Sequence, residues 1–279
     1  MCRCISSIVV MMLVNAVHGA EIPVFKFKKD QILIYKVVQT TQLSETILDE
    51  KTGKPIDQKS DTRHTVIRCW KITAVDEQGT ATMAMTIKSM KWNRTTSMGD
   101  SETFDSDKVD NLNKQEMTKL IGPVLAVIRV SKSGKLVEVK ESHAGTSSRF
   151  ATDLPLKVML PEQEVAEGFS WDRTFPIVLD PPHGTGEKYQ AVQKFTILPP
   201  ENGYLTIGAQ TTIKDMPSQP SEQLPLLALL MEGKVYVHQK SGKFIAARLK
   251  IRKEIMNHQG EGTKCLFESS YTEDLMPEE

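Results

Sequence analysis

The sequence predicts a mainly β protein: a curved antiparallel sheet or half-barrel built from two related repeats, with one inserted helix. Three observations lead to this prediction. Apolar and polar residues alternate with a period of two, short Gly-containing turns separate the alternating segments, and three landmarks recur in the same order in both halves. A period of two is typical of antiparallel strands with one buried and one wet face. We expect either one continuous curved sheet or two packed sheets.

The N-terminus is predicted to be an export signal, residues 1–19. Arg3 provides the positive start, an unbroken apolar run covers residues 8–14, and small residues follow, among them Ala16 and Gly19. We expect cleavage after Gly19, with cleavage after Ala16 as the alternative. The mature protein is then exported, periplasmic or extracellular, and does not span the membrane. Every later apolar stretch is well short of the roughly 20 residues that a spanning helix needs.

Alternating segments recur along the rest of the chain. The clearest are residues 80–88, 204–214 and 245–252, each with apolar residues at every second position. Because such segments bury one face only, they predict antiparallel strands joined by hairpins. The turn sequences between the strands lie at residues 76–79, 132–135, 200–203 and 240–243.

One helix is predicted at residues 106–121. Asp107 lies at its start, apolar residues including Met117 fall near one face, and Gly122-Pro123 ends it. Two further apolar segments, residues 153–160 and 222–231, each contain a proline. Either of them is expected to be a short helix or a strand that enters the sheet.

The recurring landmarks suggest a duplication. An aromatic strand opens each half at Tyr35 and Trp171, a hairpin then turns at Gly79 and Gly203, and a Lys-Ser-Gly-Lys turn follows at residues 132–135 and 240–243. We therefore expect a first β repeat over residues 20–150, which contains the helix, and a second over residues 151–279. The alternative is that common turn sequences recur by chance.

These motifs also carry a resemblance. The export signal, Trp70-Lys71-Ile72-Thr73 before a Gly-turned hairpin, and the run from Leu160-Pro161-Glu162 to Gly168-Phe169-Ser170-Trp171 resemble an uncharacterised family of exported bacterial proteins with duplicated antiparallel β units. The resemblance implies no activity. In architecture alone, a curved sheet with a helix on one face is similar to periplasmic lipoprotein carriers, which hold acyl chains against the concave side.

Composition and motifs give no indication of catalysis, cofactor or nucleic-acid partner. Lys plus Arg (35) equal Asp plus Glu (35), so no charge excess attracts nucleic acid. The sequence has no Gly-x-Ser-x-Gly elbow, its histidines are scattered, and no pair has metal-ligand spacing. The one cluster of carboxylates, His and flexible backbone, residues 180–187, is interpreted as a connection between strands. We therefore expect neither an enzyme nor a cofactor or metal.

Two further residue sets receive structural interpretations. Arg248, Lys250 and Arg252 project from one face of a strand, which we interpret as a solvated face. By the same alternation Cys69 is expected on the solvent side of its strand and Cys265 on the core side, which argues against a disulfide between them.

Together these features predict an exported β protein without a catalytic site, a binding or structural/interaction protein of the cell envelope. The alternative is a periplasmic carrier of an apolar, acyl-chain ligand, and a hydrolase is a less favoured third. The expected partner is accordingly a lipid or other apolar ligand, or a cell-envelope protein. A carrier would bind its ligand with adaptable side chains on the inner face of the first repeat, for which the candidates are Met83, Met85, Ile87 and Met117. The plainer interpretation is that these methionines fill an uneven core.

Overall fold

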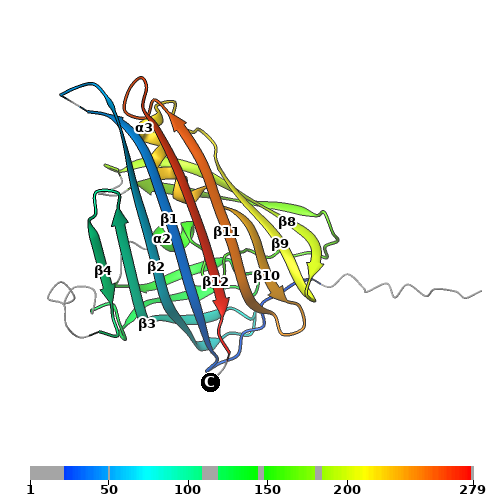
Figure 1. Cartoon of the computed structure of the whole chain (residues 1–279). Helices are drawn as coiled ribbons and strands as arrows, with labels where there is room; N and C mark the ends of the chain where they lie inside the picture. Colours follow the sequence, from blue (N-terminus) through cyan, green and yellow to red (C-terminus); the bar gives the residue numbers. More distant parts are fainter. Residues whose placement is uncertain (1–21, 50, 109–118, 144–147, 180–183, 278–279) are drawn as a thin grey trace, which may run out of the picture.

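The computed structural model describes residues 22–49, 51–108, 119–143, 148–179 and 184–277, which form one 12-stranded antiparallel sheet (Figure 1). The predicted fold class is confirmed, and of the two expected arrangements the single curved sheet is the one observed. The strand order is β6-β5-β3-β2-β1-β12-β11-β10-β9-β8-β7, and β4 pairs with β3. The strands are β1 (Ile32–Leu48), β2 (Pro55–Val75), β3 (Ala81–Thr96), β4 (Ser101–Asp105), β5 (Val124–Val130), β6 (Leu136–Ser142), β7 (Ser170–Leu179), β8 (Glu187–Glu201), β9 (Tyr204–Ile213), β10 (Glu232–His238), β11 (Lys243–Met256) and β12 (Lys264–Leu275).

The first and last strands of the chain meet in the centre of the sheet. β1 pairs antiparallel with β12, from Tyr35 opposite Leu275 to Thr46 opposite Lys264, and with β2 on its other side. Both halves of the sequence therefore contribute neighbouring strands to one sheet. The common origin of residues 20–150 and 151–279 stays a prediction, and the expected signal, residues 1–19, lies outside the described residues.

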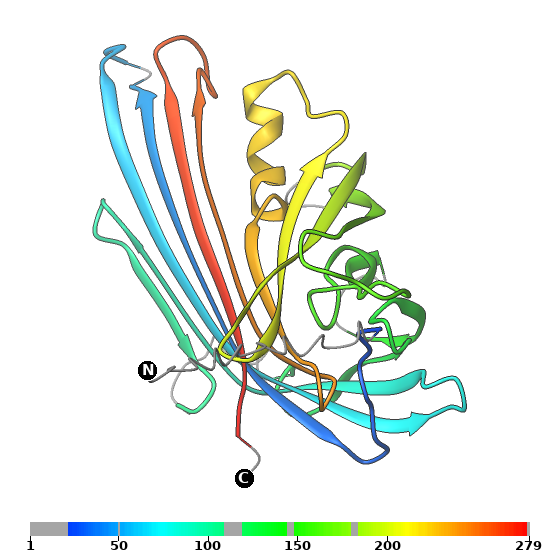
Figure 2. The same ribbon diagram turned by 90° about the vertical axis from the view of Figure 1, so that its right-hand side faces the viewer.

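The main hydrophobic core lies on the concave face of the sheet. Fully buried Tyr35, Trp70 and Phe195 lie on this face and belong to one cluster with apolar residues of the segment that crosses it. This inner segment, residues 148–160, begins with the short helix α2 (Ser148–Thr152) and continues as irregular chain. Figure 2 shows it in green at the right, on the concave side, while β1, β2, β11 and β12 rise at the left. The segment thus covers part of the curve.

A second cover crosses the concave side further along the sheet. The helix α3 (Pro220–Gln223) continues into the 3-10 helix η2 (Leu224–Leu229). Leu226 packs in a cluster with Phe175 of β7, whereas its neighbour Leu227 packs with Ile255 of β11. Because three strands separate β7 from β11 in the sheet, η2 spans from the β7 edge to the middle of the sheet.

The two Lys-Ser-Gly-Lys turns have a shared structural role. Gly134 and Gly242 both have positive φ, 84° and 58°. A Cβ on Gly134 would lie 2.7 Å from the ring of Phe25, and one on Gly242 would lie 2.6 Å from the backbone nitrogen of Lys26. The extended chain at residues 24–26 therefore crosses both turns, and only glycine leaves room for it.

Some predicted elements differ from the structure. The expected helix at residues 106–121 falls largely on residues 109–118, outside the described residues, and its described ends, 106–108 and 119–121, are turns and an isolated bridge rather than helix. Residues 153–160 are neither helix nor strand. Residues 222–231 contain the last residues of α3 and all of η2. Pro225 lies in the first turn of η2, where a backbone N–H would have no partner within the helix, so proline is tolerated there.

No helix within the described residues combines the length and the apolar character that crossing a bilayer demands.

Candidate ligand-binding site

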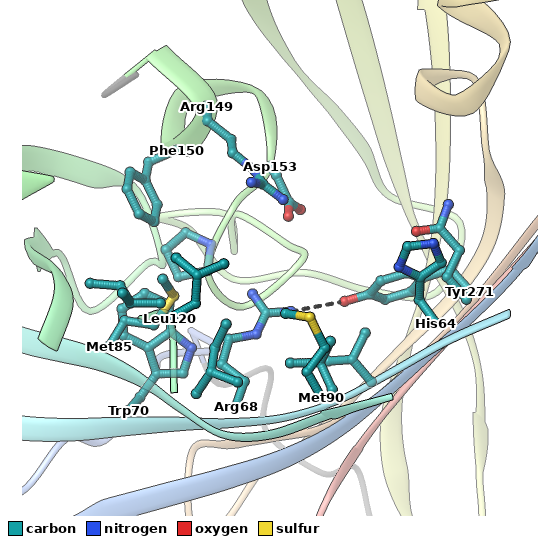
Figure 3. Close-up of a pocket in the computed structure, with 16 residues that line it drawn as sticks. His64, Arg68, Trp70, Met85, Met90, Leu120, Arg149, Phe150, Asp153 and Tyr271 are labelled. Carbon is teal, nitrogen blue, oxygen red and sulfur yellow. Dashed lines mark hydrogen bonds between the residues drawn. The ribbon is translucent and has the colours of Figure 1, made fainter. Parts of the chain in front are cut away.

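A cavity of about 320 Å³ lies between the concave face of β1, β2 and β3 and the inner segment (Figure 3). Strand register determines its floor, because Val66 lies opposite Met90, Arg68 opposite Ile87 and Trp70 opposite Met85. The side chains of alternate residues in paired strands project from one face, so this register gathers them under α2. The apolar lining is Val37, Val66, Trp70, Met85, Ile87, Met90, Leu120, Leu125, Phe150 and Pro155.

The structure separates the four predicted ligand-binding residues. Met85 and Ile87 are half-buried and line the cavity. Met83 is fully buried in the core cluster and lies outside the lining. Met117 lies outside the described residues.

Sequence reasoning missed several residues that line the cavity. Trp70 lies on the cavity side of β2, and Met90 on β3 follows a bulge that breaks the simple alternation. Arg68 lies two residues before Trp70 and therefore projects from the same face of the strand, so the two-residue period could have placed Arg68 beside the cavity. Arg149 and Phe150 come from a segment that has no periodicity.

Three polar groups form a hydrogen-bonded triad beside the cavity. Tyr271 donates its hydroxyl hydrogen to Glu273 at 2.5 Å, and Arg68 Nη2 donates to the Tyr271 hydroxyl oxygen at 3.3 Å. Arg68 Nη2 also lies 3.5 Å from Oε1 of the fully buried Glu273. Burial, reinforced by the charge of Glu273, holds the pKa of Tyr271 well above its usual value, so the phenol stays protonated and donates.

A second set of charges lies on the inner segment. Asp153 forms an ion pair with Lys157, whose Nζ lies 4.4 Å from the centre of the Tyr271 ring. Burial alone would raise the pKa of Asp153, but the charges of Lys157 and Arg68 outweigh it and hold this pKa below the usual value. The carboxylate of Asp153 therefore stays ionised, and its negative charge is balanced by the neighbouring cations Lys157 and Arg68.

A second cavity, of about 310 Å³, lies next to the first. The two share the lining residues Gln39, Arg149, Asp153 and Tyr271, so they adjoin beneath α2. Arg173 lines the second cavity, where its guanidinium donates to the Thr152 carbonyl at 2.9 Å and to Gln193 at 2.7 Å. Burial lowers the pKa of Arg173 to about 10, so it is still charged at neutral pH.

The basic stripe predicted as a solvated face lies on the convex side. There Arg248 pairs with Asp274, and Arg252 pairs with Glu268 at 3.0 Å. Of the segment 180–187, the described residues 184–187 form no part of either cavity lining, and residues 180–183 lie outside the described residues.

Comparison with known proteins gives a fold likeness at low similarity. No protein-family model matches the chain, and no curated protein matches it. Among solved structures, a structure of lipovitellin that describes lipid–protein interactions in that protein matches 90% of this chain. The identity is 8% and the TM-score is 0.42. The chain spans 25% of that lipovitellin chain. A DUF1329 family protein from Desulfovibrio piger matches 84% of this chain and 83% of its own length at 11% identity, with a TM-score of 0.14. At these scores neither likeness assigns a function.

Proposed function

We propose that this protein is an exported binding protein, without catalytic activity, that holds the apolar chain of a lipid-like ligand in the cavity beneath α2. The single observation that carries the proposal is the cavity itself. Its volume is close to the lower end of the roughly 300–1,000 Å³ typical of small-molecule sites, and its lining is mostly apolar with a few convergent polar groups.

The side chains of the lining support an adaptable site. Met85, Met90 and Ile87 are only half-buried, although they lie on the face that elsewhere forms the closed core. Unbranched thioethers adjust to irregular apolar shapes, which suits acyl chains of variable length. A core that methionines merely filled would bury them as completely as it buries Met83.

A second candidate, an interaction protein of the cell envelope, is favoured by the two strands at the ends of the sheet. Among the described strands, β6 and β7 each pair on one side only, and Val137 on β6 is 51% exposed. Both edges are protected against pairing, however, since β6 carries Glu138 and Lys140 and β7 contains Pro176, which lacks an N–H. We therefore place this candidate second.

The proposal is tested by titrating the purified mature protein with a fluorescent fatty acid, and by native mass spectrometry of protein purified from its own host. We expect saturable binding with one ligand per chain, and a copurified lipid that organic extraction removes. Neither saturable binding nor a copurified lipid would refute the carrier function and leave the interaction protein as the better candidate.

A further inference from the structure

The lining of the two adjoining cavities carries more positive than negative charge. Among the described residues that line them, four are cationic: Arg68, Arg149, Lys157 and Arg173. Asp153 is the single carboxylate among the described lining residues, and the buried Glu273 forms an ion pair with Arg68. Two carboxylates thus face four cations, of which Arg149 is exposed and can meet an incoming ligand.

Arg149 and Arg173 exceed the number of carboxylates, and Arg173 is held by the Thr152 carbonyl and by Gln193. Glu273 compensates Arg68, and Asp153 forms its ion pair with Lys157, while the charge of Arg149 acts on Asp153 only as a weaker influence that helps to lower its pKa. Within the described part of the chain, no hydrogen bond or ion pair engages Arg149. It extends from α2 over the cavity (Figure 3) and lines both cavities, so its guanidinium is available to a ligand in either.

A buried donor on the cavity floor also lacks a partner. Trp70 is fully buried and lines the first cavity, and among the described residues no acceptor receives a hydrogen bond from its Nε1. The same atom of Trp171 donates to the Met159 carbonyl at 2.6 Å, which shows that this fold satisfies indole nitrogens where it can. A buried donor without an acceptor is costly, so Trp70 Nε1 indicates an acceptor atom that a ligand brings.

The geometry points to a ligand with an anionic head group, a carboxylate or a phosphate, which lies between Arg149 above and Arg68 and Trp70 below. The inference rests on the proposed function and names the class of ligand for the same site. Figure 3 shows Arg68 and Trp70 side by side on the floor, opposite Arg149 of α2 and Asp153, which directly follows this helix. A guanidinium binds either anion with two parallel hydrogen bonds, whereas Asp153 would repel an anion that entered on the Lys157 side. The apolar chain then extends along Met85 and Phe150.

The test compares three ligands with the same alkyl chain and different head groups: laurate, lauryl phosphate and lauryl alcohol. We expect the wild-type protein to bind one or both anionic ligands at least about tenfold more tightly than the alcohol, because a hydrogen bond to a charged group is lost with the neutral head. Arg149→Gln should remove this preference, lowering affinity for the anions about tenfold and leaving affinity for lauryl alcohol unchanged. Comparing the affinities for laurate and lauryl phosphate shows whether the head group of the ligand is a carboxylate or a phosphate.

Arg63→Gln is the matched control, since Arg63 lies on the same strand as Arg68 but projects from the convex face. It removes the same charge and should change no affinity. Trp70→Phe should weaken binding of the anions more than binding of the alcohol, because a hydrogen bond to a charged acceptor is stronger than one to a hydroxyl. Equal affinity for alcohol and anions, or an unchanged preference in Arg149→Gln, would overturn the anionic head group while leaving the carrier function intact. Binding of none of the three ligands would refute both.

Discussion

Met83 and Met85 lie two residues apart on the same face of β3, yet only Met83 is sealed from the cavity. Met83 pairs with Ile72, and both side chains are fully buried. Met85 pairs with Trp70 and is half-buried at the cavity wall. The boundary between closed core and open cavity therefore passes between two methionines that the sequence pattern makes equivalent.

This difference predicts opposite effects of one substitution. Met85→Trp fills the cavity, so it should block fatty-acid binding with little change in the free energy of unfolding. Met83→Trp enlarges a side chain that has no free space and should destabilise by about 1–3 kcal/mol. Met98→Trp is the control, because Met98 is 69% exposed in a turn and should affect neither property. Fluorescent fatty-acid titration and thermal melts on all three variants measure the two effects.

The outcome that contradicts the cavity is equally definite. If Met85→Trp destabilises as much as Met83→Trp and fatty-acid binding is unchanged, the space at Met85 is part of a closed core. The methionines would then only fill an uneven interior.

The Tyr271 hydroxyl predicts a stability effect that involves no ligand. Tyr271→Phe removes the donor to Glu273 and the acceptor for Arg68, and leaves a buried carboxylate short of a partner. We expect destabilisation of about 1–3 kcal/mol in urea unfolding. Tyr236→Phe removes a comparable bond, from the Tyr236 hydroxyl to Glu201 at 3.0 Å, at a more accessible position and should cost less. Equal costs for the two variants would show that the triad has no special importance.

The sheet could be predicted from the sequence because its signal is local. The two-residue alternation at 80–88, 204–214 and 245–252 reports directly on which strand face is buried, and these segments became parts of β3, β9 and β11. Cys69 shows where the rule falls short. It lies on the face opposite Cys265 as predicted, yet it is buried rather than solvent-exposed, since cross-strand neighbours such as Ile34 flank it.

The site could not be predicted in the same way, because it depends on contacts between distant parts of the chain. Arg68 and Tyr271 are 203 residues apart and meet only because β1 joins β2 to β12. The inner segment has no period that would indicate which residues face the sheet. Only Met85 and Ile87, which belong to a strand with clear alternation, were placed beside the cavity from sequence.

The two turn glycines predict a graded loss of stability. An Ala at Gly134 or Gly242 would have to adopt a positive φ, and its Cβ would lie within 2.7 Å of another atom. Gly53 has a similar φ of 65° but no atom within 4 Å of its added Cβ. Gly53→Ala should therefore cost about 1–2 kcal/mol from backbone strain alone, and the other two variants about 1–3 kcal/mol more. Urea unfolding of the three variants gives the comparison, and equal losses would mean that the chain at residues 24–26 yields without cost.

The two cysteines of the sheet predict free thiols even after export to an oxidising compartment. Cys69 lies opposite Ile34 on β1 and Cys265 lies opposite Glu45, so eleven residues of one strand separate them. At about 3.3 Å per residue this corresponds to roughly 36 Å, whereas a disulfide requires Cα atoms within about 7 Å. Burial raises the pKa of Cys265 to about 11, which keeps its thiol protonated and slow to react. Peptide mapping without reduction should find both cysteines unlinked, and thiol reagents should modify them fully only after denaturation. A peptide that joins Cys69 to Cys265 would contradict the strand register on which the cavity floor depends.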